Sequence, residues 1–170
     1  VIEMANFDGR DIGLLHSVRE IPGFLAVGVI AITIFVREQV LGLFSLILLG
    51  VATALTGWFP QIGGILTLTL LSSIGFHYYE TVNQSLQLQW ISKERAPQIL
   101  GWLLAMGSAA SLIAFGVIVV TWKWLELSYN VAYMVSGSIT AFIALACMII
   151  YPQFQSPIPQ HKTMVLRKRY

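Results

Sequence analysis

Cysteine is nearly absent from this sequence, and charge is scarce. The single cysteine, Cys147, excludes an internal disulfide framework and a metal site built from paired thiols. Only 11% of the 170 residues are charged, compared with about 25% in soluble domains. The net charge of +2 offers no basic patch for a nucleic-acid partner. With 56% hydrophobic residues, the sequence instead predicts an integral membrane protein whose main partner is the lipid bilayer.

Apolar segments account for most of the chain. About 20 apolar residues suffice to cross a hydrocarbon core of roughly 30 Å, and short polar breaks separate five such segments, at 12–36, 40–58, 62–90, 97–122 and 131–151. The predicted fold class is therefore all-α, a transmembrane domain over residues 1–151 with about five spans. Pro22 is expected to kink the first span. Residues 152–170, which hold three prolines and a basic run, are expected to form a cytoplasmic linker or tail.

The basic residues of the short loops predict the orientation in the cell membrane. Two of them, Arg10 and Lys123, fall on one side of the five spans, whereas seven fall on the other: Arg37, Lys93, Arg95, Lys162, Arg167, Lys168 and Arg169. The larger group is expected in the cytoplasm. This arrangement places the N-terminus outside and the C-terminus inside.

The third span carries a polar stripe. His77, Glu80, Gln84 and Gln87 fall within an arc of roughly 80° on a helix. Polar groups in lipid are costly unless they face protein or water, so the stripe predicts a polar interior of the kind that transporters use. Glu80 is a candidate for proton uptake because desolvation favours a neutral carboxyl group. The simpler alternative is that these side chains bond neighbouring helices.

Two further groups of charged residues are candidates for function. Arg19 and Glu20 lie within the first span, where Arg19 either meets an anionic substrate from outside or pairs locally with Glu20. Arg37 and the run Lys93, Glu94 and Arg95 lie at cytoplasmic turns. In one interpretation they are solvated charges that fix the orientation of the helices in the membrane. In the other they form a gate, whose salt bridges between helix ends break when the two halves of the protein move.

The order of these segments resembles the second to sixth helices and central loop of the major facilitator superfamily. Residues 11–15 (DIGLL) and 21–23 (IPG) are similar to the entry to the family's second helix. Residues 37–39 (REQ) fall where the family's second and third helices join. Residues 91–102 (ISKERAPQILGW) are similar to the loop between its fourth and fifth helices. Between its second and third helices the family carries a signature of an acidic residue, a glycine and a basic pair. In this sequence only one basic residue, Arg37, remains of that signature. The antiporter glycine-proline element is absent from 107–111, so the resemblance does not extend to antiport of drugs for protons.

The resemblance implies a secondary transporter that moves a small-molecule substrate by alternating access. This chain would be a fragment of its N-terminal half, with the missing helices as further partners and with no cofactor, metal or enzymatic activity. Two alternatives stay open. One is a non-catalytic membrane assembly subunit. The other is an intramembrane enzyme, for which His77 and Glu80 offer two metal ligands but no third is evident.

Overall fold

The computed structural model describes residues 8–151 and contains helices and no strands over that range. The expected tail at 152–170 lies outside the described residues. The all-α prediction is confirmed for the described part, and the helices follow the predicted spans closely. They are α1 Gly9–Leu25, α2 Gly28–Thr33, α3 Glu38–Thr56, α4 Ile62–Trp90, α5 Ala96–Leu125 and α6 Tyr129–Ile150.

The first predicted span is divided into α1 and α2. Asp8 caps the start of α1, since its carboxylate accepts hydrogen bonds from the backbone N–H groups of Arg10 and Asp11 at 2.8 and 2.9 Å. The α-helix continues through Pro22 and is interrupted only at residues 26–27. Gly23 and Gly28 flank this interruption, and glycine is the weakest helix former after proline. The kink expected at Pro22 is therefore corrected, because the helix continues through this residue and breaks at 26–27.

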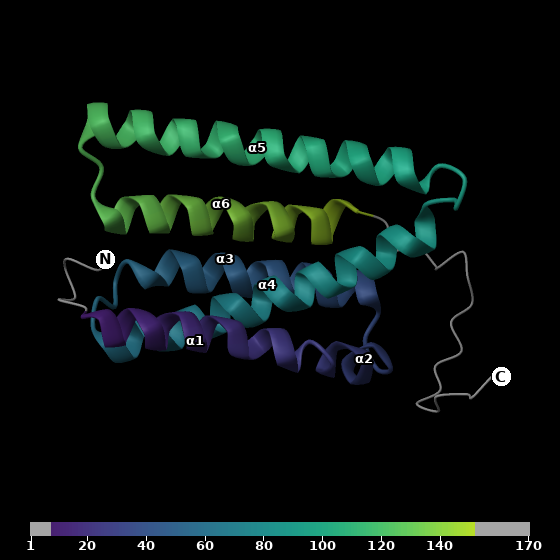
Figure 1. Ribbon diagram of the computed structural model, residues 1–170, viewed down its shortest axis with the longest axis horizontal. Helices are drawn as coiled ribbons and strands as arrows, with labels where there is room; N and C mark the ends of the chain where they lie inside the picture. The colour runs from purple at the N-terminus through teal and green to yellow at the C-terminus, as the bar shows by residue number, and fades with distance from the viewer. Residues whose placement is uncertain (1–7, 152–170) are drawn as a thin grey trace.

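Helix α3 occupies the middle of the bundle, with α4 on one side and α6 on the other (Figure 1). Its buried residues are small, and a methyl group on Gly50 would lie 2.5 Å from the backbone nitrogen of Ala141 in α6. A methyl group on Gly75 of α4 would lie 2.6 Å from the Ser45 carbonyl oxygen. Close approach of backbones through small residues is the usual packing mode of membrane helices.

The contacts fix the relative directions of the helices. Gly57 at the end of α3 lies against Asn130 at the start of α6, and Glu38 at the start of α3 meets Gln89 at the end of α4. Helix α3 is thus antiparallel to both neighbours. Helix α1 runs parallel to α4, because Arg19 lies beside Ser73 and Gly23 beside His77.

Three helices are long and apolar enough to cross a membrane: Glu38–Thr56, Ala96–Trp124 and Tyr129–Ile150. They support a membrane location for the protein. Helix α4 has the length, with 29 residues, but its polar side chains set it apart from these three. At 17 residues, α1 spans only about 25 Å. Insertion of α1 and α4 therefore stays a prediction.

Helix α5 lies at the edge of the molecule, beyond α6 (Figure 1). None of the side chains described in α5 is buried. The helix ends at Glu126 in the left-handed conformation, with φ 45° and ψ 42°. Trp122 near its end contacts Tyr129, with the ring centroids 4.6 Å apart. Most of the other side chains of α5 are exposed.

Candidate functional site: the polar face of α4

The predicted stripe lies entirely within α4. His77, Glu80, Gln84 and Gln87 project from one face of the helix, and Ser73 falls within the same arc. The residues that pack against α3, such as Gly75 and Val82, point roughly the opposite way. The helix therefore separates its packing surface from its polar face.

Helix α1 covers the first half of this face. The Ser73 hydroxyl donates a short hydrogen bond to the carbonyl oxygen of Arg19. The His77 ring lies against Gly23, where an added methyl group would come 3.5 Å from Cε1. His77 also makes an edge contact with Phe76, with the ring centroids 5.3 Å apart. These contacts explain why His77 is half-buried.

The second half of the face is open. Glu80 and Gln84 are exposed and Gln87 is half-buried. Within residues 8–151, none of these three side chains has a hydrogen bond or an ion pair. Unpartnered amide and carboxyl groups on a bundle whose remaining surface is largely apolar call for water, a ligand or further protein.

Arg19 and Glu20 pair with each other. The Arg19 Nη2 to Glu20 Oε1 distance is 3.2 Å, and the two side chains are 56% and 60% exposed. The pair lies at the level of Ser73, which is seven residues and thus roughly 10 Å along the helix from Glu80. The structure therefore does not bring Arg19 to Glu80, and the local pair expected as one alternative is present.

The four charged residues of the proposed gate gather at one end of the bundle. Arg37 is the N-cap of α3, while Lys93, Glu94 and Arg95 occupy the turn after α4 and are exposed. The hydrogen bond between Glu38 and Gln89 joins these two regions. In the part of the chain that the structure describes, no ion pair links Lys93, Glu94 or Arg95 to another residue, so the anchoring and gating alternatives both stay predictions.

Sequence reasoning missed a polar cluster at this same end. The Glu38 carboxylate accepts a hydrogen bond of 2.6 Å from the Gln89 amide and is 3.3 Å from the Ser85 hydroxyl, which donates to it. The cluster ties the first turn of α3 to the last turns of α4. Glu38 belongs to the predicted turn at 37–39, and Ser85 and Gln89 lie on a different face of α4 from the stripe, so none of the three is a predicted site residue. Their i, i+4 spacing on the face shared with Val82 was the available signal.

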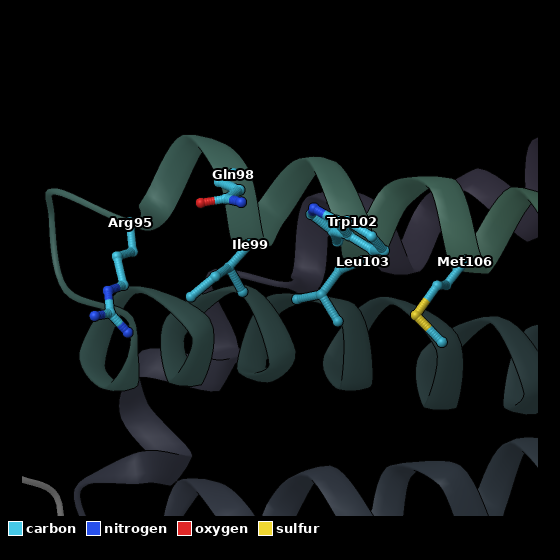
Figure 2. Close-up of a pocket in the computed structure, with 6 residues that line it drawn as sticks. All are labelled: Arg95, Gln98, Ile99, Trp102, Leu103 and Met106. Atoms are coloured by element: carbon cyan, nitrogen blue, oxygen red, sulfur yellow. The ribbon is translucent and has the colours of Figure 1, made fainter.

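One surface hollow in the described structure lies on α5, away from the stripe. It has a volume of about 510 Å³ and is lined by Arg95, Gln98, Ile99, Trp102, Leu103 and Met106. Figure 2 shows Arg95, Ile99, Leu103 and Met106 projecting from one side of the helix. The hollow is open and shares no residue with the polar face of α4.

The described residues hold no group of three His, Cys, Asp or Glu side chains placed to bind a metal ion. His77 and Glu80 thus gain no third ligand there. Comparisons with family models, with curated proteins and with solved structures find no match to this chain. Any functional assignment must therefore be argued from the polar face itself.

Proposed function

We propose that this chain is part of a secondary transporter of small solutes, resembling the major facilitator superfamily, and that the polar face of α4 lines its central cavity. The observation that carries the proposal is the unpartnered set of Glu80, Gln84 and Gln87 on an otherwise apolar bundle. Side chains of this kind within a membrane mark a water-filled path or a buried polar interface.

The direction of the helices supports the proposed topology. Arg37 and the turn at 93–95 lie at one end of the bundle, and the aromatic residues Trp58, Trp122 and Tyr129 lie at the other. Basic residues favour the cytoplasmic side and aromatic residues favour the interfaces. We propose five crossings of the cell membrane, with the N-terminus outside and the C-terminus in the cytoplasm.

In this proposal the chain supplies one wall of the cavity. A transporter of this kind works by rocking two halves about a site near the middle of the membrane. The missing helices would close the cavity opposite Glu80 and Gln84, and would also cover part of the surface of α5. The substrate would reach the polar face alternately from each side.

A second candidate function is an assembly subunit that contributes no transport path. The observation in its favour is α5, in which no described side chain is buried. A subunit that docks on partner helices would use such a surface, and the polar face of α4 would then contact protein and not water.

Accessibility to water distinguishes the two functions. We would replace Cys147 with alanine in the intact protein and introduce Glu80→Cys or Gln84→Cys, with Phe142→Cys as the control. Phe142 is 71% exposed and lies near the middle of the apolar helix α6. A cavity predicts that a membrane-impermeant maleimide labels the two α4 variants at least about tenfold faster than the control, because the thiolate reacts in water.

Equal and slow labelling of all three positions would contradict a water-filled cavity and favour the assembly subunit. Flux measurements then test transport itself. In the intact protein in vesicles, Glu80→Gln should change the pH dependence of solute uptake if Glu80 carries protons. An unchanged pH profile would remove proton transfer from the role of Glu80.

A further inference from the structure

The open half of the polar face has a charge of one sign. Glu80 is exposed and has no ion pair or hydrogen bond among residues 8–151. Phe76 lies one helical turn before it and is 48% exposed, and Gln84 lies one turn after it. Residues at i and i+4 are neighbours on a helix surface. An aromatic ring, a carboxylate and an amide therefore adjoin one another along the same open strip.

The described cations that flank α4 lie away from Glu80. Arg19 is paired with Glu20 and lies roughly 10 Å from the level of Glu80. Lys93 and Arg95 follow the end of α4, which places them more than ten residues and about 20 Å along the axis from Glu80. Arg37 lies at that same end, beside Glu38. None of these side chains compensates the charge of Glu80 in the described structure.

We propose that this strip binds a small organic cation, with an ammonium group as the recognised feature. The Glu80 carboxylate supplies the counter-charge, and the Phe76 ring offers its negative face to the cation. The side-chain oxygens of Gln84 and Gln87 accept hydrogen bonds from an N–H donor. An anion would meet an uncompensated carboxylate at short range, and is therefore excluded as the preferred ligand.

This inference rests on the proposed function, since it names the substrate class of the same cavity. It also assigns a role to Phe76, which the polar pattern alone does not single out. The strip contains one carboxylate, and His77 is turned under α1 against Gly23. A divalent metal requires more oxygen ligands than this strip provides, so an organic monocation is the better match.

The test is saturable binding of radiolabelled tetraethylammonium to the intact protein in vesicles. We expect Glu80→Gln to weaken the affinity by roughly 30-fold or more. Phe76→Leu should weaken it by roughly 3- to 10-fold, whereas Phe76→Tyr retains the ring and should bind nearly as the parent does. Glu126→Gln removes an exposed carboxylate outside the strip and should leave binding unchanged.

Thermal unfolding of each variant provides the folding control, and Glu80→Asp should retain part of the affinity. The inference is overturned if Glu80→Gln binds tetraethylammonium as well as the parent, or if benzoate binds more tightly than the ammonium probe. Its failure is distinguishable from that of transport. Binding that depends on Glu80 without any flux would support the inference and contradict the transporter, and flux of neutral or anionic solutes independent of Glu80 would do the reverse.

Discussion

Helices α3 and α5 are both apolar and both rich in glycine, yet their glycines have opposite surroundings. A methyl group on Gly50 of α3 would meet the backbone of α6 at 2.5 Å, whereas a methyl group on Gly107 or Gly116 of α5 would have nothing within 4 Å. Apolar composition thus indicates what a helix is immersed in. Its small residues allow close packing of backbones only where a partner helix is present.

The difference in packing between α3 and α5 can be tested by adding one methyl group in each helix. Gly50→Ala should destabilise the protein by about 3 kcal/mol, because the two backbones must move apart. Gly107→Ala should be neutral or stabilise by up to about 1 kcal/mol, because alanine is the better helix former. Thermal unfolding in the same detergent measures both changes.

Similar losses in the two variants would refute the difference in packing. If Gly107→Ala destabilises only a longer form of the chain, while Gly50→Ala destabilises both forms, α5 packs against helices outside the described residues.

A second comparison concerns the polar groups at the end of the bundle that holds Glu38 and Arg95. Glu38→Ala removes the acceptor that joins α3 to α4 and should cost about 1–2 kcal/mol, because two donors lose a charged partner. Arg95→Ala, in the exposed turn before α5, should change stability by less than about 0.5 kcal/mol. Denaturant or thermal unfolding of the paired variants checks this, and an equal cost for both would rule out a special role for the Glu38 cluster.

The smallest expected difference in stability is between alanine substitutions of two serines, Ser73 and Ser111. Ser73→Ala removes the hydrogen bond between α4 and the Arg19 carbonyl oxygen and should cost about 0.6 kcal/mol, the typical value for such bonds in membrane proteins. Ser111→Ala removes only a bond to the carbonyl of Gly107 in its own helix α5, and should be neutral. If Ser111→Ala costs as much as Ser73→Ala, the bond between α1 and α4 contributes nothing beyond a bond within one helix.

Hydropathy alone was enough to predict the positions of most helices. The expected span 62–90 coincides with α4, and the others agree with α3, α5 and α6 to within a few residues, because length and apolar content are properties of each segment by itself. The interruption at 26–27 was not predicted. Its position depends on where interrupting the helix costs little free energy. Pro22 is the stronger helix breaker by propensity, yet the interruption lies between Gly23 and Gly28.

The candidate site was predictable only in part. The shared face of His77, Glu80, Gln84 and Gln87 follows from helical periodicity alone. Which half of that face is covered depends on how α1 docks, and the contacts at this interface include the Ser73 and Tyr78 hydroxyls and the packing of the His77 ring against Gly23. The i, i+4 spacing places Ser85 beside Gln89, but their partner Glu38 lies about 50 positions earlier, so the local pattern does not identify it.

The parallel pairing of α1 with α4 has a consequence for biosynthesis. The carbonyl oxygen of Arg19 is bound by a hydroxyl 54 residues later in the chain. At a synthesis rate of roughly 5–20 residues per second, α1 leaves the ribosome about 3–10 s before its partner exists. During that interval the Arg19–Glu20 pair can form, because both partners are already in α1, whereas the bond to Ser73 cannot.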